Sequence, residues 1–365
     1  MARNNFISEL VYSFFKKLFS VKENNSVNIG DPKKIIIIRP HNQLGDLLAG
    51  VSLLRALKET FPECHLTLVV SPFNYPGLIK NKFVDRLVVF NKLKIYNPFY
   101  SIEFYKLLRE HYDLAVVPVT VSISFTSNLL ARLANAKIRI GASSLDGKIN
   151  KSSFFFDRRV NIDWRKHPDS NVSERTLDII RPFGINTKDY SSEISFNEED
   201  IKVADNFILS MNSVQNDLLI GFHAGAGKIP NRWSLDKYIE LMTRLKENYQ
   251  VKFYLTGSSS DKEEINYIKD KIGFPVGLFI NHKIPEVAAV ISKSDLFISN
   301  DTGIMHVAGT TGTPQISIFG PTNPFNWAPI GKNKYFIRKS ELIDDVTVSD
   351  VYELCTNILG GKSNE

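Results

Sequence analysis

The feature that most constrains this chain is the continuous β-branched run Lys34–Ile38, which leads into a polar loop. A continuous apolar run is typical of a strand buried on both faces of a parallel sheet. Parallel strands must be joined by crossover segments, which are usually helices. The sequence follows this pattern, because a helical pattern covers Leu47–Thr60 and the next apolar run is His65–Val70.

The same alternation predicts two α/β units in tandem. In the first unit we expect further strands at Arg86–Phe90, Asp113–Val117 and Lys137–Ile140, with helices at Tyr100–Glu110 and Ser122–Ala134. The pattern weakens between Ser143 and Asn197, where we expect a helix at Asn171–Phe183 and otherwise connecting structure. It restarts with strands at Asp217–Phe222, Val251–Leu255, Asp295–Ser299 and Gln315–Phe319, and helices at Ser234–Asn248, Asp261–Ile272 and Pro285–Ser292. The expected organisation is an N-terminal segment (1–30) and two α/β domains (31–195 and 196–365).

Length and composition limit the function classes. A chain of 365 residues with 43% apolar residues can bury two cores. The net charge is only +6 and the basic residues are scattered, which argues against nucleic-acid binding. The two cysteines, Cys64 and Cys355, lie far apart, so we expect buried thiols in a reducing compartment and neither a disulfide framework nor a zinc site.

The N-terminal segment has helical periodicity. It is too short and too charged to span a membrane and lacks the pattern of a signal peptide. Two interpretations remain open: residues 1–20 lie on an anionic membrane surface, or they dock on the protein itself or on a second subunit. The apolar positions are Phe6, Ile7, Leu10, Val11, Phe14, Phe15 and Leu18, and Lys16 and Lys17 lie among them.

Three polar loops follow predicted strands, where ligands bind in α/β sheets. They are Arg39–Asp46, His223–Lys228 with its extension Asn231–Trp233, and the turn at Asp301. In the turn, Asp301 or Thr302 can cap the next helix and Gly303 permits close approach of an anionic or hydroxyl-rich ligand. The first loop lacks G-x-G-x-x-G, which disfavours an NAD-dependent oxidoreductase.

The sequences around these loops resemble glycosyltransferase family 9, which contains the ADP-heptose:lipopolysaccharide heptosyltransferases. The resemblance covers roughly residues 33–330, in the correct order. It is carried by IIIIRPHNQLGDLLAGVSLLRALKETFPECHLTLVV, FHAGAGKIPNRWSLDKYIEL and AAVISKSDLFISNDTGIMHVAGTTGTPQISIFGPTNPFNW. It implies a GT-B fold, in which two Rossmann-like domains face each other across a cleft, with donor on the C-terminal domain and acceptor on the N-terminal one. It also implies inverting, metal-independent sugar transfer.

The resemblance assigns roles residue by residue. Asp46 corresponds to the family's proposed catalytic base, although it could also cap the helix expected from Leu47. The acceptor side comprises Arg39, His41, Asn42 and Gln43. The donor side comprises Gly225, Ala226, Gly227, Lys228, Arg232, Asp261, Glu263, Asp301, Thr302, Gly303 and His306. Asp261 or Glu263 would bind the ribose, with helix capping the alternative for Asp261, and His306 either packs its helix or contacts the ligand.

This chain departs from the family pattern at Asn231, where the family usually has Lys. Arg232 or Lys228 would then supply the positive charge beside the diphosphate.

The expected activity is transfer of a heptose-like sugar from a nucleotide-diphosphate donor, most simply ADP-heptose, to a lipid-linked saccharide such as lipopolysaccharide. No cofactor is expected, and the absence of Asp-x-Asp argues weakly for metal independence. The expected location is the cytoplasm, peripheral on the inner face of the cytoplasmic membrane. A nucleotide-sugar epimerase of the same fold and a non-catalytic sugar-nucleotide binding protein remain alternatives.

Overall fold

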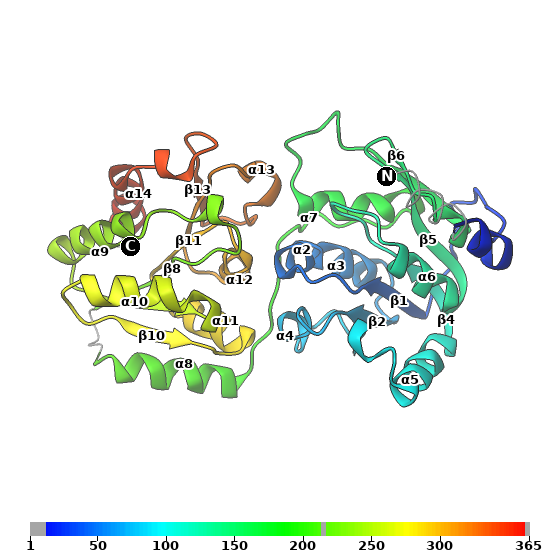
Figure 1. Cartoon of the computed structure of the whole chain (residues 1–365), viewed down its shortest axis with the longest axis horizontal. Coiled ribbons are helices and arrows are strands. Elements are labelled where there is room, and N and C mark those ends of the chain that lie inside the picture. Colours follow the sequence, from blue (N-terminus) through cyan, green and yellow to red (C-terminus); the bar gives the residue numbers. More distant parts are fainter. Residues whose placement is uncertain (1–11, 213–216, 362–365) are drawn as a thin grey trace. The chain divides into compact units, whose positions relative to one another are not determined.

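The computed structural model describes residues 12–212 and 217–361. The chain divides into two compact units with the boundary between Tyr190 and Ser191. Each unit is an α/β layer structure, described separately below as unit 1 and unit 2 (Figure 1).

Unit 1 is built on a seven-stranded sheet with the order β3-β2-β1-β4-β5-β6, and β7 pairs with β5. All pairs are parallel except β5 with β6. The β-branched run forms the central strand β1, whose four isoleucines are buried, as the sequence predicts. The strands are β1 (Lys34–Arg39), β2 (His65–Val70), β3 (Arg86–Val89), β4 (His111–Val116), β5 (Asn135–Leu145), β6 (Lys148–Ile149) and β7 (Arg158–Ile162).

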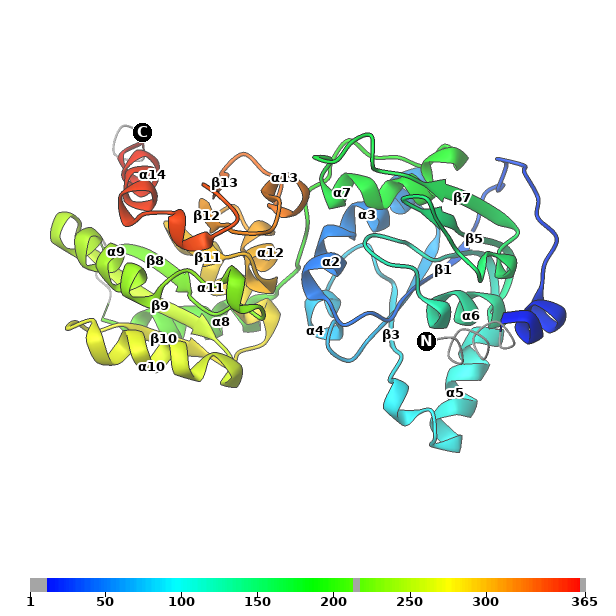
Figure 2. The same cartoon turned by 45° about the horizontal axis from the view of Figure 1, so that its top comes forward.

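Helices cover both faces of this sheet (Figure 2). Leu107 and Leu108 of α5 and Leu130 of α6 pack on the face that presents Ile36 and Ile38. The α-helices are α2 (Leu44–Ala49), α3 (Val51–Thr60), α4 (Tyr75–Leu78), α5 (Pro98–Arg109), α6 (Phe125–Leu133) and α7 (Val172–Arg175). The 3₁₀ helices are η1 (Lys92–Lys94), η2 (Ser153–Phe155), η3 (Thr176–Ile179) and η4 (Arg181–Phe183).

Unit 2 contains a six-stranded, fully parallel sheet with the order β10-β9-β8-β11-β12-β13. Its strands are β8 (Leu218–His223), β9 (Val251–Gly257), β10 (Gly277–Ile280), β11 (Leu296–Asn300), β12 (Gln315–Ile318) and β13 (Lys334–Ile337). Because the strands are parallel, their carboxyl ends share one edge of the sheet. The loop His223–Lys228, called the glycine loop below, and the Asp301 turn both start at this edge.

The helices of unit 2 also lie on both faces of the sheet. Trp233, Tyr238 and Val351 belong to the core on one face. The α-helices are α8 (Glu198–Ser210), α9 (Leu235–Asn248), α10 (Lys262–Lys271), α11 (Ile284–Ser292), α12 (Gly303–Gly309), α13 (Pro324–Trp327) and α14 (Val348–Gly361). The 3₁₀ helices are η5 (Ile229–Asn231), η6 (Ser259–Asp261) and η7 (Ile343–Asp345).

The predicted helix Asn171–Phe183 is wrong. The segment forms the short pieces α7, η3 and η4 instead. Pro182 has no backbone N–H for an α-helical hydrogen bond, and Gly184 ends the run with φ of 78°. Strand β7 lies just before this segment, in a stretch where the pattern predicts only connecting structure.

Part of the N-terminal segment docks on unit 1. Residues 12–19 are helical, whereas Phe6, Ile7, Leu10 and Val11 lie outside the described residues. Phe15 packs edge-on against Phe125 at a centroid distance of 5.3 Å, and the Arg132 side chain donates to the Phe19 carbonyl at 2.7 Å. Phe14 and Leu18 face outward. Within the described helix, Phe15 therefore faces the protein while Phe14 and Leu18 face solvent, so these three residues do not form one face.

Candidate functional site

On unit 1, the loop after β1 brings Arg39 and Asp46 together. Both side chains are buried, and Arg39 Nη2 lies 3.7 Å from Asp46 Oδ2 and 3.2 Å from the Asp46 carbonyl oxygen. The same Nη2 donates to Thr120 Oγ1 at 2.9 Å, whereas the buried Nε of Arg39 has no hydrogen-bond partner among the described residues. The carboxylate therefore sits beside a cation held by Thr120.

Burial shapes the protonation of this pair. It raises the pKa of Asp46 above the ordinary carboxyl value, while the charge of Arg39 and a hydrogen bond from Thr120 act in the opposite direction. Burial also lowers the pKa of Arg39. A carboxylate whose pKa is raised accepts a proton more readily than an ordinary surface Asp, which suits a general base.

Asp46 does not cap a helix beginning at Leu47. Helix α2 begins at Leu44 with Gln43 as its N-cap residue, and Asp46 lies in its first turn. Asp46 therefore lies within the first turn of α2 and not at the end of β1, where the sequence suggests it.

The other predicted acceptor residues precede α2. His41 is half-buried, and burial together with the charges of Arg39 and Lys92 lowers its pKa to about 4. Ser71 Oγ and Asn74 Nδ2 donate to the His41 carbonyl at 2.9 and 2.5 Å, which fixes the loop backbone. Asn42 and Gln43 are exposed.

On unit 2, the glycine loop leaves β8 at its carboxyl end. A Cβ atom at Gly225 would lie 2.2 Å from Asp261 Oδ1, so the loop passes this side chain more closely than any other residue allows. Nothing lies within 4 Å of the corresponding position at Gly227, and Gly227 and Lys228 are exposed. Ala226 between them is buried. The tip of the loop therefore exposes the backbone at Gly227 and the positively charged side chain of Lys228.

Arg232 is engaged within unit 2. Its Nη1 donates to Glu264 Oε1 at 2.5 Å, and its Nε donates to the Ala226 carbonyl at 2.8 Å. Its charge is therefore already paired with the buried Glu264. Lys228 carries no ion pair among the described residues, so it is the better source of charge for a diphosphate.

The structure gives Asn231 a role that the sequence did not. Asn231 Nδ2 donates to Asp301 Oδ2 at 2.9 Å, which links the extension of the glycine loop to the Asp301 turn. Burial raises the pKa of Asp301, and a hydrogen bond from Thr322 and the charge of Lys228 oppose this shift. Thr302 occupies the N-cap position of α12, as expected, but its side chain makes no capping hydrogen bond to any described residue. Thr302 and Gly303 are half-buried at this turn.

Asn300, the last residue of β11, holds the loops together. Its Nδ2 donates to the Ala224 carbonyl at 2.7 Å, and its Oδ1 accepts from the Trp233 amide at 3.2 Å and from the Tyr238 hydroxyl at 3.0 Å. Asn300 is fully buried. Asn300, like Thr120 of unit 1, is a polar residue at or just beyond the carboxyl end of an apolar strand, and this is the sequence signal that could have found them.

Asp261 serves as a local cap. Its Oδ2 accepts from the amide and hydroxyl of Ser258 at 2.8 and 2.9 Å, which completes a capping box with η6. Glu263 is exposed in the first turn of α10. His306 is buried beside Trp327, and burial lowers its pKa to about 4, so the imidazole is neutral at pH 7.

Two kinds of feature were sought in the described residues, a metal-binding cluster and a membrane-spanning helix. No group of three or more His, Cys, Asp or Glu in residues 12–212 and 217–361 could hold a metal ion. In the same residues, no helix is both long and apolar enough to cross a membrane.

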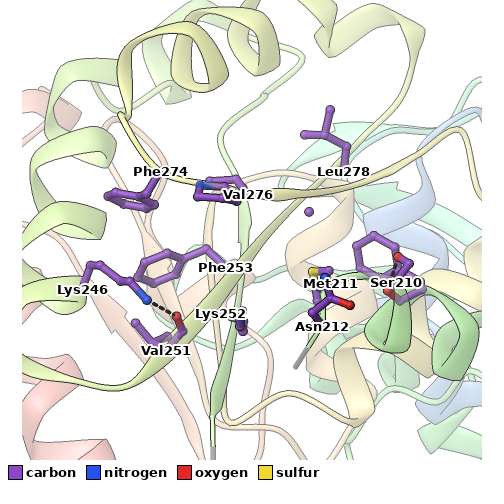
Figure 3. A pocket seen from close by; sticks show the side chains of 13 residues that line it. Ser210, Met211, Asn212, Lys246, Val251, Lys252, Phe253, Phe274, Val276 and Leu278 are labelled. Carbon is purple, nitrogen blue, oxygen red and sulfur yellow. Dashed lines mark hydrogen bonds between the residues drawn. The ribbon is translucent and has the colours of Figure 1, made fainter. Parts of the chain in front are cut away.

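A hollow on unit 2 lies near Val251 and Gly277, the first residues of β9 and β10 (Figure 3). It is therefore at the opposite edge of the sheet from the glycine loop.

The chain is similar to known proteins in both sequence and fold. The model of glycosyltransferase family 9 (heptosyltransferase) matches residues 102–350. The chain belongs to glycosyltransferase family 9. This glycosyltransferase is similar to the lipopolysaccharide core heptosyltransferase OpsX of Haemophilus influenzae, with 23% identity over 300 residues, 82% of each chain.

Two solved structures show the fold of this glycosyltransferase. A family 9 protein from Veillonella parvula DSM 2008 matches with a TM-score of 0.77 and 20% identity, over 90% of this chain and 97% of that one. The ADP-heptose LPS heptosyltransferase II of E. coli matches with a TM-score of 0.71 and 18% identity, over 90% and 99%. The predicted GT-B class, with two Rossmann-like parallel-sheet units, is confirmed.

Proposed function

We propose that this glycosyltransferase moves a heptose from ADP-heptose to a lipopolysaccharide-type acceptor, with inversion and without a metal ion. The observation that carries the proposal is Asp46, a buried carboxylate with a raised pKa, held in the first turn of α2 beside Arg39, the last residue of β1. Family membership supports the reaction class, and the names of the similar proteins support the donor and the acceptor.

In the proposed reaction, unit 1 activates the acceptor. Asp46 takes the proton of an acceptor hydroxyl, and that oxygen forms a bond to the anomeric carbon of the heptose. The bond from this carbon to the diphosphate oxygen breaks, and its electron pair leaves with ADP. Attack opposite the leaving group inverts the anomeric centre. Arg39 keeps the carboxylate ionised until the hydroxyl arrives, and His41, Asn42 and Gln43 lie in the same loop to contact the acceptor.

Unit 2 holds the donor in this proposal. Lys228 and the open backbone at Gly227 face the diphosphate, because they are the exposed cation and the exposed glycine of the loop. Asp301, oriented by Asn231, contacts the sugar, with Thr302 and Gly303 beside it. Arg232 acts through the loop rather than on the phosphate, because its guanidinium is paired with Glu264.

The ribose contact falls to Glu263 in this proposal. Asp261 already accepts two hydrogen bonds from Ser258, whereas Glu263 is exposed. Neutral His306 supports α12 through its packing on Trp327. A lipid-linked acceptor would place the enzyme at the cytoplasmic membrane surface.

Two experiments test the proposal in sequence. Thermal unfolding in ADP-, GDP-, UDP- and dTDP-sugars should show stabilisation by ADP-heptose, because a ligand that binds only the folded state raises its apparent stability. Labelled heptose should then pass to a lipopolysaccharide core that lacks its outer heptose, with Asp46→Asn as the control. Turnover of donor without acceptor would indicate an epimerase, and donor binding without any product would indicate a binding protein. Either result would refute transfer.

A further inference from the structure

An exposed aromatic patch lies on unit 1, outside the loops described above. It runs from η1 into α5, and its most exposed members are Leu93 (87%), Tyr96 (92%) and Phe99 (81%). The aromatic patch comprises Leu93, Ile95, Tyr96, Phe99, Ile102 and Tyr105. Contiguous exposed apolar surface of this kind marks an interaction site in a soluble protein.

The fold holds these side chains outward. Asn91 accepts from the Leu93 amide at 3.0 Å, and Asn97 accepts from the Phe99 amide at 3.0 Å, so side-chain caps define both helix starts. The opposite face of α5 is anchored by Leu107 and Leu108, which pack in the core. The patch is therefore the surface left over after α5 has buried its core-facing residues.

Positive charge predominates around the patch. Lys92, Lys94 and Lys106 are exposed, and among the described residues none of them has an ion-pair partner. One exposed carboxylate, Glu103, lies among the patch residues of α5. Glu110, at the far end of α5, is paired with Arg86 at 2.9 Å. Apolar side chains ringed by unpaired lysines complement a surface that is apolar inside and negatively charged at its face.

A second segment repeats the combination. In the helix of residues 12–19, Phe14 and Leu18 are exposed beside exposed Lys16 and Lys17. This helix packs against α6 through Phe15 and Phe125, and α5 also packs against α6. The two segments therefore belong to one helical layer of unit 1, on the same face of its sheet (Figures 1 and 2).

The patch lies near the acceptor loop. Strands β1, β2 and β3 are parallel, so Asn91 after β3 and the loop after β1 share the carboxyl edge of the sheet. The charge of Lys92 is one of the causes that lower the pKa of His41. A surface bound to the patch would therefore lie close to this edge.

We propose that the aromatic patch, with the exposed face of residues 12–19, docks unit 1 onto an anionic lipid bilayer. Charge complementarity selects this occupant. A symmetric dimer through the patch would bring the lysines of two copies together, and like charges repel. A bilayer accepts the apolar side chains below its headgroups and the lysines among its phosphates.

Vesicle co-sedimentation of the full chain without donor or acceptor tests this proposal independently of the proposed reaction. We expect binding to phosphatidylcholine vesicles that contain phosphatidylglycerol and much weaker binding to phosphatidylcholine alone. The variant Leu93→Ser/Tyr96→Ser/Phe99→Ser should lose about tenfold or more in affinity. Lys92→Gln/Lys94→Gln should lose about fivefold per lysine, on the anionic vesicles only.

A matched control removes equally exposed apolar side chains elsewhere. Ile149→Ser/Leu209→Ser/Leu342→Ser, whose side chains are 68–80% exposed, should bind like the parent chain. Melting temperatures should match throughout, since all of these side chains face solvent. Equal binding by the patch variant and the parent would overturn the proposal, as would equal binding to neutral vesicles.

Two further measurements address other occupants. A chain beginning at Tyr12 should bind the anionic vesicles; loss of binding in that chain, with the patch variant unaffected, would assign attachment to residues 1–11 and refute the patch. Light scattering should give the same mass for parent and patch variant. A dimeric parent and a monomeric variant would identify the patch as a subunit interface instead.

Discussion

At the residue scale, burial and the neighbouring Arg39 distinguish the Asp46 carboxylate from an ordinary surface carboxylate. Burial raises its pKa, and Arg39 limits that rise. If Arg39 were absent, the carboxyl would stay protonated to a higher pH; if the site were open to water, the carboxylate would be a weaker proton acceptor. Burial and the charge of Arg39 together set the pKa of this one carboxyl group near the acceptor loop.

We expect Asp46→Asn to lower kcat by about 10²–10⁴-fold with little change in donor affinity, because Asn cannot accept the hydroxyl proton. In the parent enzyme, activity should fall as the pH falls through the raised pKa of Asp46, since only the ionised form acts as a base. Initial rates across pH and calorimetric titration of the donor measure both. Near-native turnover by a folded Asp46→Asn protein would remove Asp46 from the chemistry.

Asn231 should matter through Asp301 rather than by itself. Asn231→Ala should weaken donor binding by about tenfold, in the range for loss of a hydrogen bond to a charged group. In a double-mutant cycle, the same change should have little further effect in an Asp301→Ala background. Additive losses in calorimetric titrations would show that the two residues act separately. Glu247→Gln is a useful control because Glu247 is exposed on α9 and has no role in the proposed site.

The residue types at the site were more predictable from the sequence than their partners. The loops that carry Asp46, Lys228 and Asp301 could be located because each follows an apolar strand. The pairing of Arg232 with Glu264 could not, because 32 positions separate them and only the fold brings α10 beside the loop.

At the scale of elements, the N-terminal helix shows what the spacing of apolar residues can and cannot predict. The spacing of apolar residues predicts a helix within residues 1–20, and residues 12–19 of this segment are helical. It does not predict which apolar residues face the protein, because both Phe14 and Phe15 satisfy the pattern. The sequence also did not predict β10 and β13, at the two edges of the unit 2 sheet. Strand β12 has the same length and was predicted, but it is buried throughout, whereas β10 and β13 have exposed residues and so a weaker apolar pattern.

We expect adjacent phenylalanines to give opposite results. Phe15→Ala should destabilise unit 1 by about 1–3 kcal/mol, because the ring contacts Phe125 and Phe155. Phe14→Ala, on the exposed face, should change stability by no more than about 0.5 kcal/mol. Urea unfolding of the two variants provides the measurement. Equal destabilisation would mean that the helix does not dock as described.

At the scale of the whole molecule, the alternation of strands and helices was enough to predict two parallel-sheet units. Each unit has its own buried core, one around Ile36 and Phe90 and the other around Trp233 and Tyr238. The continuous β1 run and the restart at β8 carried this prediction, because buried parallel strands have a strong sequence signature.

Catalysis should not require a divalent metal. In the proposed site, positive charge for the diphosphate comes from Lys228 and from loop backbone. Rates in EDTA should equal rates in magnesium, whereas Lys228→Ala should lower kcat/KM by about tenfold through loss of a charged contact. Inactivation by EDTA that magnesium or manganese reverses would contradict this.

The way Asn300 holds the glycine loop has an evolutionary consequence. Its side-chain amide donates a hydrogen bond to the main-chain carbonyl of Ala224 and accepts one from the main-chain amide of Trp233. Neither bond involves the side chain of Ala224 or Trp233. The main chain of the loop is thus held from a buried position, while the side chain of an exposed position such as Ile229 can change without altering that hold. Descendants of such a scaffold can vary the exposed tip without rebuilding the loop, whereas replacement of Asn300 would affect every substrate alike.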